Sequence, residues 1–138
     1  MTKTIDMQSL RYLKLFMKIT HIQIKNCFYY NNMIIFAVPR KLLSKAIGKQ
    51  AVNVKKISEI LRKRIRIIAL PKGEEDLRKF IESIVAPVTF NELEVKENEV
   101  IMNPGKQTKA ALIGRNKRRL LEMKKIIQDY FEKDFRII

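Results

Sequence analysis

Two short basic loops contain the residues whose types and spacing suggest chemistry. Gly48-Lys49-Gln50-Ala51 is followed, 66 positions later, by Gly114-Arg115-Asn116-Lys117. In each loop a glycine ends one expected helix and a second helix begins within about four residues, so free backbone N–H groups and the positive end of a helix dipole point into the loop. Glycine permits close approach to the backbone, and Lys49 or Arg115 adds a cation. A loop of this kind is suited to binding a phosphate group.

The loops belong to a longer internal repeat. A single loop of this type is ordinarily a plain helix–turn–helix connection with glycine at the helix C-terminus. Here the matching extends beyond the loops: Val54, Ile57, Ile60 and Leu61 correspond to Leu120, Met123, Ile126 and Ile127, and residues 65–68 correspond to residues 135–138. A repeat of this length predicts two structural units of one architecture.

The charge of the chain is strongly positive and unevenly distributed. The chain has 29 Lys and Arg against 14 Asp and Glu, a net charge of +15. Residues 1–72 hold 16 basic and 2 acidic side chains, a net charge of +14, whereas residues 73–138 hold 13 and 12, a net charge of +1. An excess of this size favours nucleic acid as the partner over an acidic membrane, a protein, or a merely solvated surface.

Other classes of protein find little support in the sequence. Cys27 and His21 are the only cysteine and histidine, too few for a zinc site, and Cys27 is expected to be a small buried hydrophobic residue rather than a nucleophile. There is no paired-carboxylate or Ser-His-Asp pattern, so we expect no enzyme activity, cofactor or metal. The longest apolar run, residues 33–38, is too short to span a membrane, and the N-terminus lacks a signal pattern. We therefore expect a cytoplasmic, monomeric protein.

Periodicity and turn residues predict the same order of elements in both units. The expected domains are residues 1–71 and 72–138. The first contains a helix over 6–19, strands over 21–30 and 33–38 joined at Asn31-Asn32, helices over 41–47 and 51–63, and a strand over 65–70. The second contains a helix over 74–85, strands over 88–95 and 99–102, helices over 106–113 and 117–131, and a strand over 135–138. Each unit therefore reads α-β-β-α-α-β, an α+β class with helices on one face of a sheet.

This order, with an Ile-Gly-x-x-Gly-like loop between the last two helices, resembles the prokaryotic (type II) KH domain. Cys27 in the first hairpin, and Ile47-Gly48-Lys49 followed by Val52-Asn53-Val54, resemble the archaeal NusA-like factors. Those factors consist of little more than the two KH domains of the bacterial termination and antitermination factor NusA. The resemblance covers essentially the whole chain.

The resemblance implies a function and a set of contact residues. KH domains bind about four nucleotides of single-stranded RNA, and their Gly-x-x-Gly loop clamps the backbone. By position, the RNA-binding residues would be Ile47, Gly48, Lys49, Gln50, Ala51 and Lys55 in the first unit, and Gly114, Arg115, Asn116, Lys117 and Arg118 in the second. Bases would lie in an apolar groove, for which Ile47, Val54 and Ile57 are candidates, although each is equally suited to an ordinary core position. The implied process is transcription termination or antitermination, with RNA polymerase or ribosomal components as further partners.

Both loops depart from the family pattern because they lack its final glycine. Ala51 leaves space for a phosphate, provided that its backbone is not left-handed. Lys117 is bulkier but adds charge, with Arg118 and Arg119 behind it, so the second loop is expected to depend more on charge. The first unit, whose loop is surrounded by six basic residues, is expected to dominate phosphate contact (Arg40, Lys41, Lys45, Lys49, Lys55 and Lys56). The alternative is a basic structural protein, associated with the ribosome or RNA polymerase, that binds without functional clamps.

Overall fold

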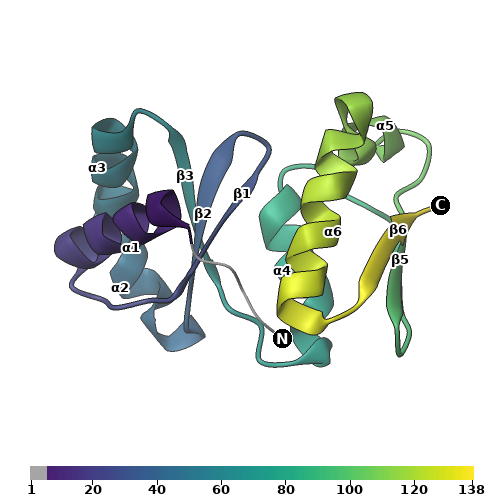
Figure 1. The fold of residues 1–138 in the computed structure, drawn as a ribbon, viewed down its shortest axis with the longest axis horizontal. Helices are drawn as coiled ribbons and strands as arrows, with labels where there is room; N and C mark the ends of the chain where they lie inside the picture. Colours follow the sequence, from purple (N-terminus) through teal and green to yellow (C-terminus); the bar gives the residue numbers. More distant parts are fainter. Residues whose placement is uncertain (1–5) are drawn as a thin grey trace. The chain divides into compact units, whose positions relative to one another are not determined.

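The computed structural model describes residues 6–138, which form two compact units, residues 6–72 and residues 73–138. Residues 1–5, at the start of the first predicted domain, lie outside the described residues. In each unit the elements follow the order α-β-β-α-α-β, and the helices of the unit pack on a three-stranded sheet (Figure 1). The predicted α+β class and order of elements are confirmed.

The first unit is assembled around a hairpin. Helix α1 (Met7–Thr20) begins at Asp6, whose carboxylate accepts a hydrogen bond from the Ser9 N–H at 2.7 Å. Strands β1 (Asn26–Tyr30) and β2 (Met33–Val38) pair antiparallel. They are joined by Asn31 and Asn32, both with positive φ, as the predicted turn requires. Helices α2 (Leu43–Ile47) and α3 (Val52–Leu61) lead to β3 (Arg64–Ala69), which pairs parallel with β2.

The core of the first unit holds α3 in place. Alternate residues of a strand face the same side of a sheet, and Ile34, Phe36 and Val38 of β2 belong to the cluster that includes the helices. Phe16 of α1 stacks on Phe36 with ring centroids 4.8 Å apart, and Ile57 of α3 is fully buried in the same cluster. Helix α3, which begins where the first loop ends, is therefore anchored by packing about one and a half turns from its N-terminus.

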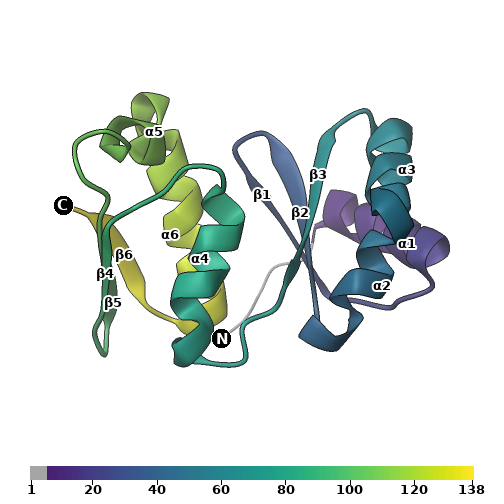
Figure 2. The same ribbon diagram turned by 180° about the vertical axis from the view of Figure 1, so that it is seen from behind.

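The second unit repeats this plan (Figure 2). Its elements are α4 (Leu77–Val85), β4 (Glu92–Val95), β5 (Glu99–Asn103), α5 (Lys109–Ile113), α6 (Arg118–Phe131) and β6 (Asp134–Ile137). Strand β5 pairs antiparallel with β4 and parallel with β6. Phe80 of α4 packs on Tyr130 of α6 with centroids 5.2 Å apart, so the helix after the loop is again fixed by its distant end.

Two predicted strands are longer than the observed ones. The strand predicted over 21–30 begins only at Asn26, although Ile22 and Ile24 are buried. The strand predicted over 88–95 begins only at Glu92, although Phe90 is buried beneath the Arg78 guanidinium, 4.7 Å from its ring centroid. In both segments the alternation reflects burial of every second side chain without a hydrogen-bonded ladder.

Candidate nucleic-acid interface

The first loop is a single tight turn between α2 and α3. Gly48 has φ +83°, residues 49–51 form one 3₁₀ turn, and Gln50 and Ala51 both have left-handed backbones, with φ 55° and 60°. The positive φ of Gly48 favours glycine, and the available space requires it, since a Cβ at this position would lie 2.8 Å from Cγ1 of Val52. The predicted loop glycine therefore occupies a position that only glycine fits.

The second loop has the same backbone. Gly114, Asn116 and Lys117 have φ 78°, 56° and 61°. A Cβ on Gly114 would lie 2.7 Å from Cγ of Arg119 and 2.8 Å from its backbone nitrogen. The repeat seen in the sequence thus extends to the backbone dihedral angles, and the structure gives the two sets of predicted loop residues matching conformations.

Ala51 and Lys117, which replace the final glycine of the family pattern, both have left-handed backbones. The condition under which Ala51 was expected to leave space for a phosphate, a backbone that is not left-handed, is therefore not met. For a residue with a Cβ this conformation costs roughly 1–2 kcal/mol. Residues held in such conformations concentrate at ligand-binding sites, where the surrounding structure maintains them.

Each loop leaves two neighbouring backbone donors unused. The N–H of Gly48 donates to the Ser44 carbonyl at 3.0 Å, and that of Ala51 donates to the Gly48 carbonyl at 3.0 Å. Within the described part of the chain, the N–H groups of Lys49 and Gln50 have no acceptor. The second loop repeats this arrangement. The Gly114 N–H donates to the Ala110 carbonyl at 2.9 Å, and the Lys117 N–H donates to the Gly114 carbonyl at 3.1 Å. The N–H groups of Arg115 and Asn116 have no acceptor among the described residues.

The helix that follows each loop also favours an anion. No side chain caps α3 or α6 in the described structure, and neither helix has an acidic residue in its first turn. The partial positive charge of the helix N-terminus is therefore not neutralised by the protein. Together with two free donors, this arrangement is able to hold a phosphate oxygen.

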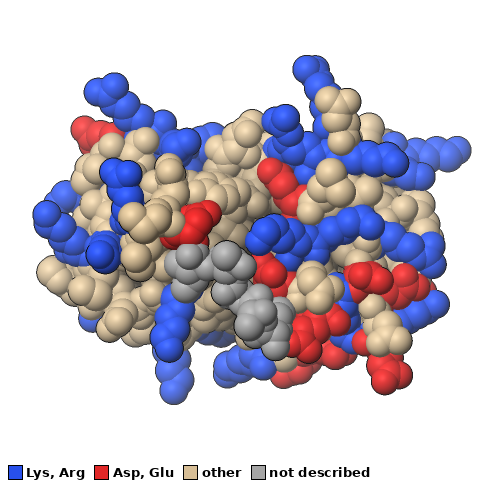
Figure 3. All heavy atoms as spheres, in the orientation of Figure 1, with Lys and Arg blue, Asp and Glu red and all other residues tan. Residues whose placement is uncertain are grey.

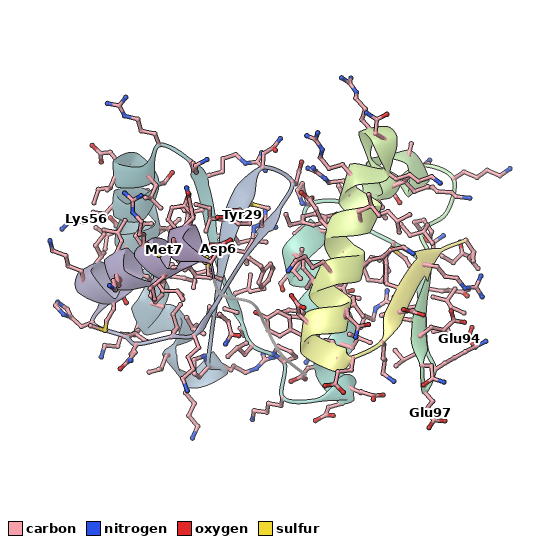
Figure 4. All side chains as sticks on the ribbon, viewed as in Figure 1. Asp6, Met7, Tyr29, Lys56, Glu94 and Glu97 are labelled. Carbon is pink, nitrogen blue, oxygen red and sulfur yellow. The ribbon has the colours of Figure 1, made fainter. Side chains whose placement is uncertain are left out.

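Exposed cations surround both loops. Lys45, Lys49, Lys55 and Lys56 are exposed, and their side chains make no ion pair with any described residue; Lys56 projects outward from α3 (Figure 4). Around the second loop, Arg115, Lys117 and Arg118 are likewise exposed and free of ion pairs among residues 6–138. Every charged residue predicted for RNA contact is thus accessible.

Arg119 does not join this group. Its side chain is buried, and Nε pairs with Oε1 of Glu122 at 2.9 Å. The expectation that Arg119 adds charge to the second loop is therefore wrong. The corresponding residue of the first unit is Asn53, whose Nδ2 donates to the carbonyls of Lys45 and Ala46 at 3.3 and 3.0 Å. Different side chains thus occupy the space beneath two loops of equal shape.

Sequence reasoning left the role of Asn53 unassigned. Its amide joins the end of α2 to the start of α3 and so fixes the angle at which the two helices enter the loop. Asparagine followed by a helix is too common a pattern to reveal this contact, because the acceptors are carbonyls seven and eight residues away.

The three candidates for an apolar groove differ in accessibility. Ile57 is fully buried and is a core residue, so its assignment to the groove is wrong. Ile47 and Val54 pack against the same core but are half-buried, and each therefore keeps part of its side chain available to a ligand.

Charge in the second unit is separated between its two ends. Nζ of Lys133, only 4% exposed, donates to the carbonyls of Lys96 and Glu97 at 2.6 Å each and pairs with Glu74 at 3.2 Å. Lys133, between α6 and β6, therefore joins the 3₁₀ turn that precedes α4 to the β4–β5 turn. Acidic residues gather at this end, including Glu97 at the tip of the hairpin (Figure 4), whereas basic side chains surround α5 (Figure 3). The loop of this nearly neutral unit is locally basic.

Cys27 is not poised for nucleophilic chemistry. It packs against the core of the first unit, but it is half-buried rather than buried as predicted. Burial raises the pKa of its thiol to about 12, and the Asp6 carboxylate adds to the rise, so the thiol is protonated at neutral pH.

Among residues 6–138 no group of three or more His, Cys, Asp or Glu is arranged to hold a metal ion. None of the helices in this range has the length and apolar composition needed to cross a membrane.

The fold and loops define a repeated α+β protein with a basic turn at the start of one helix in each unit. No protein-family model matches the chain. It is similar to archaeal proteins named probable transcription termination protein NusA. That of Methanocaldococcus jannaschii is 35% identical over 81 residues, 59% of this chain and 43% of the relative. That of Methanococcus vannielii is 32% identical over 85 residues, 62% and 47% of the two chains. The chain thus spans about half the length of these relatives.

Two further comparisons cover more of the molecule. A protein of the same name from Halococcus morrhuae is 24% identical over 98 residues, which is 71% of this chain and 68% of that protein. The crystal structure of APE1850 matches 97% of this chain and 99% of its own, with a TM-score of 0.67 and 23% identity. That likeness concerns the fold, and it extends across both units.

Proposed function

We propose that this chain is a non-catalytic, NusA-like protein of two tandem type II KH domains that binds single-stranded RNA in transcription termination or antitermination. The observation that carries the proposal is the pair of loops with one backbone geometry, each offering two free N–H groups beside exposed cations. The names of the archaeal relatives support the transcriptional role. RNA polymerase and ribosomal components are the candidate protein partners.

The clamp is tested by reversing charge in one loop at a time. Lys49→Asp with Gln50→Asp should weaken binding to an unstructured RNA by about 10–100-fold, because charge-assisted hydrogen bonds contribute about 1.5–3 kcal/mol. Aspartate tolerates the left-handed backbone at position 50, so the fold should persist. The matched variant in the second loop is Arg115→Asp with Asn116→Asp.

A control with the same change in net charge separates the clamp from the alternative. Gln23 and Lys25 are exposed between α1 and β1, so Gln23→Asp with Lys25→Asp removes the same charge outside the loops. If the control weakens binding as much as the loop variants do, the protein binds through its general basic surface and lacks functional clamps.

Salt dependence provides a second measure. Affinity for single-stranded RNA should fall with a log–log slope of roughly −0.7 for each phosphate neutralised. A loop variant that removes a phosphate contact should make the slope shallower by that amount. An affinity independent of salt would contradict RNA as the principal partner.

The transcriptional role needs its own assay. Adding the protein to a reconstituted archaeal transcription reaction should change read-through at a terminator, and the loop variants should lose that effect. Increased read-through indicates antitermination and decreased read-through indicates termination. Unchanged read-through, from a protein that binds RNA, would contradict the transcriptional role and leave the clamps intact.

A further inference from the structure

The helices that follow the two loops each carry one exposed aliphatic and one exposed basic side chain, three residues apart, and the order of the two is reversed between the units. In α3, Val52 is 52% exposed and Lys55 follows three residues later. In α6, Arg118 comes first and Leu121, 58% exposed, follows three residues later. Residues three apart lie on one face of a helix. The 66-residue repeat aligns position 52 with 118 and position 55 with 121, so the aliphatic and cationic residues are exchanged between the units.

Val52 lies directly against the first loop. Its Cγ1 occupies the space that a Cβ on Gly48 would need, 2.8 Å from that position. The unused N–H groups of Lys49 and Gln50 belong to the same turn. A phosphate held by this turn would lie beside the Val52 side chain, about half of which is exposed.

Neither aliphatic residue is needed by the core. The buried residue of α3 is Ile57, and those of α6 include Met123 and Ile127. A single exposed aliphatic side chain is common and requires no explanation. Val52 adjoins the first turn, Leu121 lies one helical turn beyond the second, and each is three residues from an exposed cation. An apolar group and a cation on one helix face can contact a base and a phosphate of the same strand.

We propose that Val52 and Leu121 are base-contacting residues and that the two units contact RNA in opposite orders. This rests on the proposed function. In the first unit the base contact adjoins the loop and Lys55 meets a phosphate one turn further along α3. In the second unit Arg118 reinforces the phosphate contact at the loop and Leu121 meets a base one turn further along α6. Binding by the first loop then depends more on the presence of bases, and binding by the second depends more on phosphates.

The test compares two ligands, an oligouridine and an abasic oligomer with the same ribose–phosphate backbone and length. Val52→Ser and Leu121→Ser should each lower affinity for oligouridine by about three- to tenfold, as expected for exposing part of an aliphatic side chain. Neither should change affinity for the abasic oligomer. Lys55→Gln should lower affinity for both. The matched control is Ile60→Ser, since Ile60 is 53% exposed on α3 but lies two turns beyond the loop.

The outcomes separate this inference from the proposed function. If Val52→Ser lowers affinity equally for oligouridine and the abasic oligomer, the base contact is overturned. It is also overturned if this variant binds both ligands as tightly as the wild-type protein does. Failure of the wild-type protein to bind either ligand would overturn the proposed function itself. Because the substituted side chains are exposed, each variant should fold normally, and circular dichroism of each variant checks this.

Discussion

Replacing Ala51 with glycine should stabilise the protein, although the same change within a helix is destabilising. Ala51 has a left-handed backbone, with φ 60° and ψ 31°. Removing its Cβ relieves roughly 1–2 kcal/mol of steric cost. Glycine also makes the unfolded chain more flexible, which costs about 0.4–1 kcal/mol. The free energy of unfolding should therefore rise by about 0.5–1 kcal/mol.

The assay is urea and thermal denaturation followed by circular dichroism. For a unit of 60–100 residues, such a gain corresponds to a rise in Tm of about 2–8 °C. The control is Ala110→Gly, which removes the same methyl group from an exposed position in α5 and should lower stability by up to about 1 kcal/mol. If Ala51→Gly lowers stability as the control does, the left-handed backbone is not a source of strain and the reasoning is refuted.

The second loop allows strain and charge to be separated. Lys117→Gly should also stabilise the fold, because Lys117 has φ 61°. It removes an exposed cation, however, so it should weaken RNA binding, whereas Ala51→Gly should not. Equal effects of the two substitutions on RNA affinity would contradict a role for the charge of Lys117.

Three further predictions follow from the packing. At pH 8 Cys27 should react with iodoacetamide about 1,000-fold more slowly in the folded protein than in urea, because its pKa rises from 9.0 to about 12. Equal reaction rates would contradict burial of the thiol. Because the unfolded chain loses the thiol proton first, the free energy of unfolding should also fall as the pH rises above about 9. Lys133→Met should lower the free energy of unfolding by about 1–3 kcal/mol, whereas the exposed Lys124→Met should have almost no effect in the same urea titration. Asn53→Ala should cost about 1 kcal/mol through its two lost hydrogen bonds, and unchanged stability would show that they do not hold α2 on α3.

The order of elements was predictable because the turns have distinctive chemistry. Asn31 and Asn32 adopt the positive φ that asparagine tolerates, and Pro39 follows the last residue of β2. The starts of β1 and β4 were not predictable. The buried Ile22 and Ile24 produce the alternation of a strand, but hydrogen-bond pairing depends on a partner strand that the local sequence does not specify.

The candidate site was predictable in position but not in conformation. The repeat identified Gly48 and Gly114, because only glycine fits both the dihedral angle and the available space. The left-handed backbone of Ala51 opposes the preference of alanine, so the residue type did not indicate it. The burial of Arg119 was missed because arginine is seldom buried unless paired. Glu122, three residues later, was the available signal for that pairing.

The distribution of charge in the second unit changes what its net charge of +1 means. Charges beyond about 8 Å are largely screened at physiological salt, so a phosphate at the second loop is governed by Arg115, Lys117 and Arg118 rather than by acidic residues at the opposite end of α6. We therefore expect a loop's affinity for phosphate to depend on its own cations rather than on the total charge of its unit. The Arg115→Asp, Asn116→Asp variant should then reduce the salt slope about as much as its counterpart in the first loop. A slope that changes only with the first-loop variant would show that the +14 charge of residues 1–72 dominates binding.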